Sequence, residues 1–141
     1  MIRSVLAVLA GYVVTGLGAT ASDLLIGVIF PGWQNRPLGQ PPTLFHTVPY
    51  VLYTALFAVV GGYLAALIAR RLEIRHAIAV GVLGFLLALG PVISNFPTDL
   101  TWYKIAVPPL FLAGAYLGGY LRLRQVSKDA TSSEVETAGE V

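Results

Sequence analysis

Four long apolar stretches occupy most of this chain and constrain its fold more than any other feature. They cover residues 5–30, 48–69, 77–93 and 100–121 of a sequence of 141 residues. The hydrocarbon core of a bilayer requires about 20 apolar residues per helix. Hydrophobic residues make up 56% of the chain and charged residues 11%, with a mean hydropathy of +0.75. The sequence therefore predicts an all-α polytopic membrane protein with four transmembrane helices in one bundle.

The basic residues divide unevenly between the two sides of this arrangement. Short cytoplasmic loops of membrane proteins carry an excess of Lys and Arg. We therefore expect a multi-pass protein of the cell membrane, similar to small bacterial inner-membrane proteins, with both termini in the cytoplasm. The basic excess then indicates topology and not a nucleic-acid partner. Of the nine Lys and Arg residues, Arg36 and Lys104 fall on the outer side, and the other seven are Arg3, Arg70, Arg71, Arg75, Arg122, Arg124 and Lys128.

The chain divides into a helical bundle and a polar C-terminal segment. Residues 1–124 hold the four apolar stretches, whereas residues 125–141 are rich in Ser, Thr and Glu and lack apolar periodicity. Such a segment buries too little apolar surface to fold, so the sequence predicts a disordered cytoplasmic tail. Near the N-terminus, the Ala-Thr-Ala run at 19–21 fits a signal-peptide cleavage site. Apolar sequence resumes directly after it, so one long span is the simpler interpretation.

A weak internal repeat relates the second and fourth stretches. A Gly-Tyr-Leu run at 62–64 and an Ala-Tyr-Leu run at 115–117 each precede two arginines, at an offset of 53 residues that also pairs Tyr50 with Tyr103. These two spans would run in the same direction, as in the parallel repeats of some transporters. A duplicated helical hairpin is one explanation. The shared composition of apolar, glycine-containing helices is the other.

Small residues recur at every fourth position in three of the stretches. This spacing brings them to one face of a helix, where small side chains let helix backbones approach closely in a membrane. We expect these rows to pack the bundle together, and a contact between two copies of the chain is the alternative. The rows are Ala7, Gly11, Thr15, Ala19 and Asp23 in the first stretch, Ala58, Gly62 and Ala66 in the second, and Gly114, Ala115, Gly118 and Gly119 in the fourth.

Asp23 is the only acidic residue inside an apolar stretch. An ionised carboxylate that faces acyl chains is costly, so it should face the bundle or water. Counted from Arg3, Asp23 lies about 30 Å along the helix axis, which places it near the outer surface. We expect a structural role there, with Ser22, a loop amide, Lys104 or Arg36 as the partner. An ion or proton site is the alternative.

Other polar residues gather at the same outer level and would form an outward-facing polar pocket with Asp23. Aromatic residues surround this level, as in the aromatic belts of membrane interfaces. The predicted pocket consists of Asp23, Arg36, His46, Asn95 and Lys104, and the aromatic residues are Trp33, Phe45, Tyr50, Phe96, Trp102 and Tyr103.

The sequence contains no motif of a catalytic or cofactor site. Cysteine is absent, which excludes thiolate catalysis and thiolate metal sites. His46 and His76 begin the second and third stretches on opposite sides, separated by a bilayer core of about 30 Å. We therefore expect no catalytic residue, no metal and no cofactor.

The sequence favours two functions for this bundle, and a membrane enzyme that uses the outer polar residues is the weakest of three. The first is an accessory, assembly or scaffold component that packs with other membrane helices or with itself. It follows from the small-residue rows and the scarcity of charge within the stretches. The alternative is a small oligomeric transporter or channel that uses Asp23 as an intramembrane carboxylate.

Overall fold

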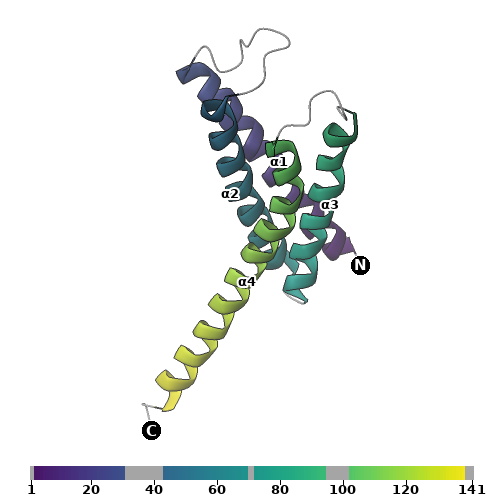
Figure 1. Cartoon of the computed structure of the whole chain (residues 1–141). Coiled ribbons are helices and arrows are strands. Elements are labelled where there is room, and N and C mark those ends of the chain that lie inside the picture. Colours follow the sequence, from purple (N-terminus) through teal and green to yellow (C-terminus); the bar gives the residue numbers. More distant parts are fainter. Residues whose placement is uncertain (1, 31–42, 70–71, 95–101, 139–141) are drawn as a thin grey trace.

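The computed structural model describes residues 2–30, 43–69, 72–94 and 102–138, which form four α-helices (Figure 1). Helix α1 spans Ile2–Ile29, α2 spans Leu44–Ala69, α3 spans Glu73–Ser94 and α4 spans Trp102–Ala138. No strand occurs within the described ranges. The all-α prediction is therefore confirmed for this part of the chain.

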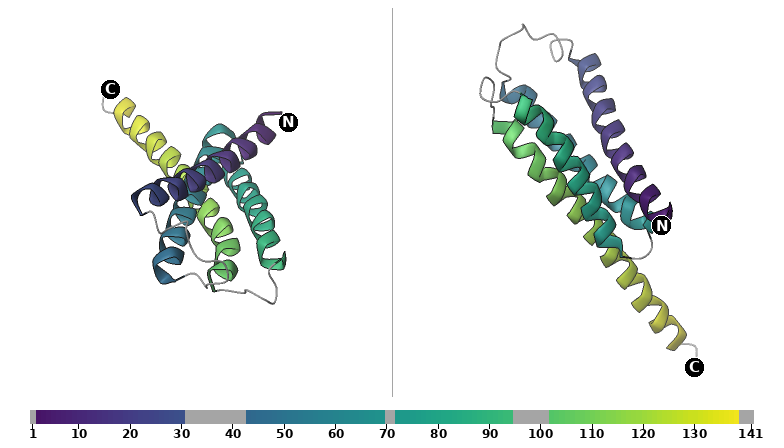
Figure 2. Two further views of the ribbon diagram at one scale, coloured as in Figure 1. Left: turned by 90° about the horizontal axis from the view of Figure 1, so that it is seen from above. Right: turned by 90° about the vertical axis from the view of Figure 1, so that its right-hand side faces the viewer.

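The helices form one bundle in which successive helices run in opposite directions (Figure 1). Helices α2 and α3 each contact the other three, whereas α1 contacts only α2 and α3 within the described residues. Helix α1 runs obliquely across the rest of the bundle (Figure 2). The first turn of α1 and the last turn of α4 lie toward the same end (Figure 1).

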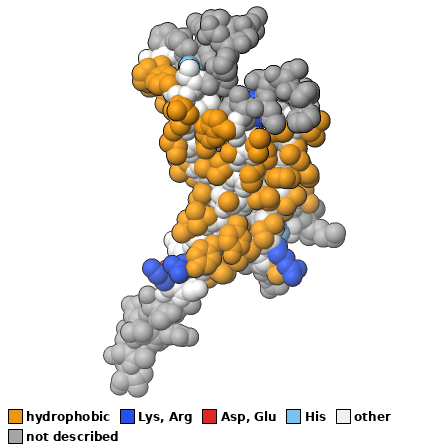
Figure 3. Space-filling view, viewed as in Figure 1, with side chains coloured by type: hydrophobic (Ala, Val, Ile, Leu, Met, Phe, Trp, Pro, Cys, Tyr) orange, Lys and Arg blue, Asp and Glu red, His pale blue; other side chains and the backbone are white. Residues whose placement is uncertain are grey.

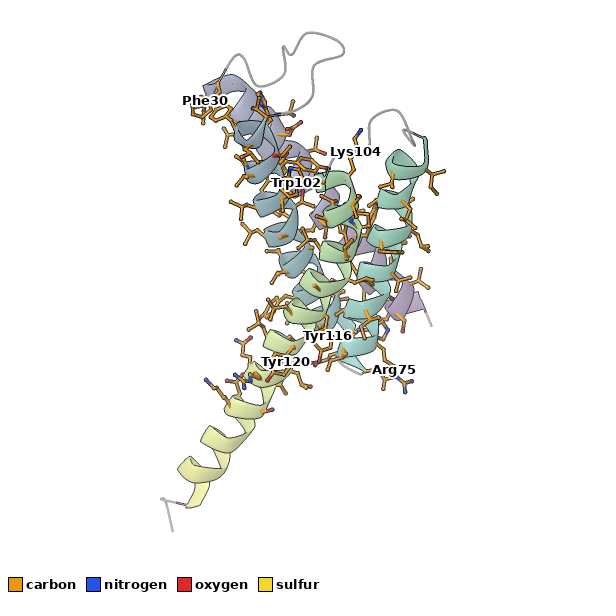
Figure 4. All side chains as sticks on the ribbon, in the orientation of Figure 1. Phe30, Arg75, Trp102, Lys104, Tyr116 and Tyr120 are labelled. Atoms are coloured by element: carbon orange, nitrogen blue, oxygen red, sulfur yellow. The ribbon has the colours of Figure 1, made fainter. Side chains whose placement is uncertain are left out.

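Side-chain chemistry distinguishes the two ends of the bundle. Hydrophobic side chains cover the sides of the bundle in Figure 3, and Lys and Arg gather at its lower end. We call this lower end, where α1 begins and α2 ends, the basic end; Arg75 lies there (Figure 4). The opposite end carries Phe30 and Trp102 (Figure 4) and is called the aromatic end.

Three of the helices are long and apolar enough to cross a membrane. They do so over Arg3–Ile29 in α1, Leu44–Ala69 in α2 and Glu73–Gly90 in α3. The described part of α4 does not reach the same apolarity, since it contains Lys104 and the Pro108–Pro109 pair. Large apolar side chains are exposed on all four helices, as expected where a surface contacts acyl chains; they include Leu17, Val28, Leu52, Leu86, Ile93 and Leu117. These features are consistent with a membrane protein.

Small residues form the interior of the bundle. Close contact between backbones matters here because lipid supplies no hydrophobic force between helices, which are held by dispersion and weak polar contacts. The predicted rows of α2 and α4 are buried inside the chain, as is the first part of the α1 row up to Thr15, whereas Ala19 and Asp23 are only half-buried. Alanines at most 1% exposed are Ala7, Ala58, Ala65, Ala66, Ala77 and Ala115, and the buried glycines include Gly11, Gly62, Gly114, Gly118 and Gly119.

Two adjacent glycines on α2 mark the closest approaches. A Cβ built at Gly11 of α1 would lie 2.6 Å from the carbonyl oxygen of Gly61. A Cβ built at Gly62 would collide with the backbone of Ala115 in α4. A side chain at any of these glycines would force helices apart. Gly61 and Gly62 therefore set the distances from α2 to α1 and to α4.

Helix α4 continues to Ala138, whereas the sequence predicted a disordered tail from residue 125. This part of α4 projects beyond the bundle (Figure 1), and the side chains at 127–129 are exposed. Extending an existing helix avoids the cost of nucleation, and Gln, Lys, Glu and Ala are good helix formers. The lack of apolar periodicity in this segment therefore does not decide whether the segment is helical.

The packing gives mixed support to a duplicated hairpin. Gly62 and Ala115, which the proposed offset relates, meet across the α2–α4 contact. A two-fold axis between the hairpins would make the contact of α2 with α3 equivalent to a contact of α4 with α1. Helices α2 and α3 touch, but α1 and α4 do not within the described residues. The duplication stays a prediction.

Gly11→Ala and Gly16→Ala form a matched pair of substitutions in α1. A methyl group at position 11 would press on the Gly61 carbonyl, and such overpacking should cost about 1–3 kcal/mol. A Cβ at position 16 meets nothing within 4 Å, so Gly16→Ala should be neutral or stabilise by about 0.5–1 kcal/mol. Unfolding of both variants in detergent micelles measures the difference. Equal stabilities would contradict the close contact of α1 with α2.

Candidate functional site

Asp23 lies in α1, six residues before the helix ends at Ile29, and its side chain is half-buried. Its Oδ1 atom accepts a hydrogen bond of 3.1 Å from the phenolic hydroxyl of Tyr53 on α2. A hydroxyl that donates to a carboxylate stabilises the charged form, and hydrogen bonds to charged groups are stronger than neutral ones. The contact therefore offsets part of the cost of placing Asp23 in an apolar helix.

Tyr53 was not among the partners expected for Asp23. The hydroxyl of Ser22, which was, donates instead to the carbonyl oxygen of Gly18 at 2.9 Å. The ring of Tyr53 is 9% exposed and packs edge-on against Tyr50, with 5.5 Å between the ring centroids. This packing holds the hydroxyl in place, so Asp23 meets a preset donor.

His46 lies in the first turn of α2, close to the start of the helix. Its Nδ1 lies 2.7 Å from Oγ1 of Thr43, and its ring is edge-on to Phe45 at 5.4 Å. Phe45 in turn contacts Phe30 at the end of α1, with 5.7 Å between centroids. These contacts join the end of α1 to the start of α2, which is a structural role.

The predicted polar pocket is described only in part. Arg36 and Asn95 lie outside the described residues. Asp23 contacts Tyr53, His46 contacts Thr43, and Lys104 lies at the aromatic end of α4 (Figure 4). The described residues place three of the five members toward one end of the bundle. Whether the five share a pocket stays a prediction.

Thr15 is a further polar residue that sequence reasoning placed only in a packing row. It is 2% exposed, and its Oγ1 lies 2.9 Å from the carbonyl oxygen of Gly11 and 3.1 Å from that of Phe57 on α2. The hydroxyl can donate to either oxygen, so it adds a polar contact between α1 and α2. Such contacts between membrane helices are worth about 0.6–2 kcal/mol.

A second group of polar contacts lies at the basic end. Nε of Arg3 donates to the carbonyl oxygen of Ile68 at 2.9 Å, which joins the start of α1 to the end of α2. The hydroxyl of Tyr63 donates to Oε1 of Gln125 at 2.6 Å. Arg124 lies over the ring of Tyr120, with its guanidinium carbon 5.0 Å from the ring centroid. From the sequence, Arg3 and Arg124 indicated only the topology of the chain. Their contacts with Ile68 and Tyr120 could not be predicted from the pattern.

No group of three or more His, Asp and Glu side chains that could hold a metal ion occurs among the described residues of either end. The hydrogen bonds described above join a phenol to the carboxylate of Asp23, and at the basic end they use a guanidinium group, a phenol and an amide. Each of these three bonds joins two helices.

Comparison of the chain with protein families, with curated proteins and with solved structures gave no match. The fold and the contacts therefore define its class by themselves. In its described residues the chain is all-α, with four helices of which three are long and apolar enough to cross a membrane.

The Asp23–Tyr53 hydrogen bond can be tested by a double-mutant cycle. We expect Asp23→Asn and Tyr53→Phe each to cost about 1–2 kcal/mol of stability, because each weakens a hydrogen bond to a charged group. The double variant should cost less than the sum of the two, with a coupling energy of about 1 kcal/mol. Unfolding in detergent micelles provides the measurement.

Tyr116→Phe serves as the control for this cycle. Tyr116 is 49% exposed, and its ring stacks on Tyr120 at 6.5 Å between centroids. Loss of its hydroxyl should leave stability nearly unchanged and should not couple to Asp23→Asn. Strict additivity of Asp23→Asn and Tyr53→Phe would show that the hydrogen bond contributes nothing.

Proposed function

We propose that this chain is a membrane-embedded accessory, assembly or scaffold component, which associates with other membrane helices or with a second copy through the exposed face of α1. The main support is that the residues of α1 buried against the bundle, Ala7, Gly11 and Thr15, lie on one side of the helix, which contacts α2 and α3 in the described structure. Its opposite side carries a continuous exposed face, which consists of Leu9, Val13, Gly16, Thr20 and Leu24.

The spacing of this face suits a helix–helix contact. Steps of three and four residues keep its members on one side of a helix. Gly16 and Thr20 are the small pair at its centre, and small residues four apart allow close approach of a second helix. A Cβ at Gly16 meets nothing within 4 Å, whereas Gly11 and Gly18 on the same helix are already contacted from α2. Gly16 is therefore a small residue of α1 that the bundle itself does not use.

The buried rows cannot supply the same contact. The sequence left open that Gly11, Gly62 or Gly118 forms a seam between copies, but each of them meets another helix of the same chain. We therefore assign association to the Gly16 face. No catalytic step is proposed, because the described polar groups hold helices together.

In the same proposal α4 is the fourth span, and both termini face the cytoplasm. Between Lys104 and Arg122 the sequence of α4 holds no charged residue. Arg3, Arg75, Arg122 and Arg124 belong to the basic end, in agreement with the tendency of cytoplasmic segments to be rich in Arg and Lys. The cell membrane of a bacterium is the proposed location.

Reporter fusions test this topology. A fusion at residue 40 should report the outer side, and one at the C-terminus the cytoplasmic side, because four spans bring the chain back to where it began. A third fusion after Arg75 should agree with the C-terminal one. Reporters at residue 40 and at the C-terminus on the same side would refute the four-span arrangement.

Association through α1 can be tested with Gly16→Leu and Gly90→Leu. Both glycines are exposed and have open space around the Cβ position, so neither substitution should disturb the bundle. Gly16→Leu should weaken association about tenfold, which corresponds to a loss of roughly 1.4 kcal/mol of binding free energy. The loss is measured as reduced co-purification of partner helices or reduced energy transfer between labelled copies. Gly90→Leu on α3 should leave both unchanged.

The readouts are mass spectrometry of a detergent pull-down and energy transfer in vesicles. Equal behaviour of the two leucine variants would refute association through this face. A proton or cation flux in vesicles that disappears specifically in Asp23→Asn would instead favour the transporter alternative. The hydrogen bond from Tyr53 to Asp23 supports the structural role of this carboxylate.

A further inference from the structure

A pocket opens at the basic end, where residues from all four helices converge. It has a volume of about 680 Å³ and is lined by Arg3 of α1, Leu67 and Ile68 of α2, Glu73 of α3, and Arg122 and Val126 of α4. The membrane-crossing part of α1 starts at Arg3 and that of α3 at Glu73, while that of α2 ends at Ala69. The pocket thus lies where apolar helices give way to charged residues, at the depth of lipid headgroups.

We propose that this pocket binds the phosphate group of an anionic membrane phospholipid. The proposal goes beyond helix association and requires only that the helices cross a bilayer. Basic pockets between membrane helices on the cytoplasmic side are a known way of binding lipid phosphates. The argument here rests on the lining residues of this chain.

Arg122 carries the strongest indication. Its Nε atom is buried and has no hydrogen-bond partner in the described structure. Its Nη1 makes only a long contact of 3.4 Å with Oε1 of Gln125, an oxygen that already accepts a bond from Tyr63 at 2.6 Å. A buried donor without an acceptor is costly. A phosphate oxygen satisfies it well, because the planar guanidinium group can donate two parallel N–H bonds to a phosphate.

Arg3 supplies the second cation of the pocket. Its Nε donates to the carbonyl oxygen of Ile68 in the last turn of α2, and this bond holds the side chain toward the pocket. The terminal nitrogens of its guanidinium group are additional donors. Arg3 and Arg122 come from opposite ends of the chain, so a phosphate between them would join α1 to α4.

Glu73 decides the charge of the ligand. Its Oε2 is also buried without a hydrogen-bond partner in the described residues, and it lines the same pocket. Two arginines and one glutamate leave a formal charge of +1 in the lining. A lipid with a single net negative charge balances it, whereas a zwitterionic lipid does not. Leu67, Ile68 and Val126 supply apolar contacts for the part of the lipid next to the phosphate.

The test is native mass spectrometry of the full-length protein with defined lipids. Phosphatidylglycerol is the anionic probe, and phosphatidylcholine and phosphatidylethanolamine are the zwitterionic ones. We expect phosphatidylglycerol to be retained in preference to both. Arg122→Gln should reduce the retention of phosphatidylglycerol about tenfold, because the substitution removes a hydrogen bond between charged groups. Glu73→Gln should increase it, because the substitution removes the negative charge from the lining.

Arg124→Gln is the matched control. It removes the same charge two residues away on α4, but Arg124 lies over the ring of Tyr120 and does not line the pocket. Retention in this variant should stay within about twofold of the parent, since a single exposed charge near the membrane adds a weak, general attraction. Equal losses in Arg122→Gln and Arg124→Gln would overturn the proposal in favour of general attraction to the basic end.

Arg3→Gln covers the case in which Arg122→Gln does not fold, because Arg3 is exposed. Arg3→Gln should also weaken retention of phosphatidylglycerol, and an unchanged value would count against the site. Two further results would overturn the proposal. One is equal retention of all three lipids. The other is displacement of phosphatidylglycerol by inorganic phosphate, which would assign the pocket to a free anion. None of these readouts depends on the association of α1 with other helices.

Discussion

The close approach of α2 to its neighbours is the constraint on which the rest of the structure depends. In a membrane, helices gain little by hiding apolar surface from lipid, so contact at small residues holds them together. Gly61 lets α1 approach, and Gly62 lets α4 approach. On α4, a Cβ at Gly118 would collide with the backbone of Val59 and would lie 2.6 Å from the backbone nitrogen of Tyr63. These contacts fix how far each helix can slide along α2.

One antiparallel register follows from this approach and extends along the whole α1–α2 pair. At the basic end Arg3 bonds to Ile68, and near the middle Gly11 meets Gly61. Further along, Thr15 bonds to Phe57, Asp23 to Tyr53, and Phe30 packs on Phe45; each step forward on α1 is matched by a step back on α2. Asp23 therefore lies opposite the buried phenol of Tyr53 because the contact of Gly11 with Gly61, two to three helical turns away, sets the register.

This register explains which features could be predicted from the sequence. The lengths and positions of α1, α2 and α3 and the start of α4 follow from the apolar stretches, and most members of the small-residue rows lie on interior faces. The Tyr53 partner of Asp23 follows from a comparison of depth between two helices, which the sequence pattern near Asp23 alone does not supply. Asp23 precedes the end of α1 by six residues and Tyr53 follows the start of α2 by nine, so the two are at similar depth.

Other features depend on tertiary contacts that no local pattern encodes. The sequence indicates a basic end, but it does not show that Arg3, Glu73 and Arg122 line one pocket, because they are far apart in the chain. The helix from residue 125 to Ala138 illustrates a different limit. Its composition lacks an apolar face, and helix continuation from a packed segment is decided by elongation, not by burial.

Helix α1 is the least enclosed of the four helices in the described residues. It contacts α2 and α3 but not α4 within the described residues, and its outer face carries the unfilled space at Gly16. The basic-end pocket is where α1 and α4 both contribute lining residues, Arg3 and Arg122. A phosphate bound between them would connect two helices that make no contact in the described residues. A ligand that binds only the assembled arrangement stabilises it by mass action, so an anionic lipid there would hold α1 in the register that presents its Gly16 face.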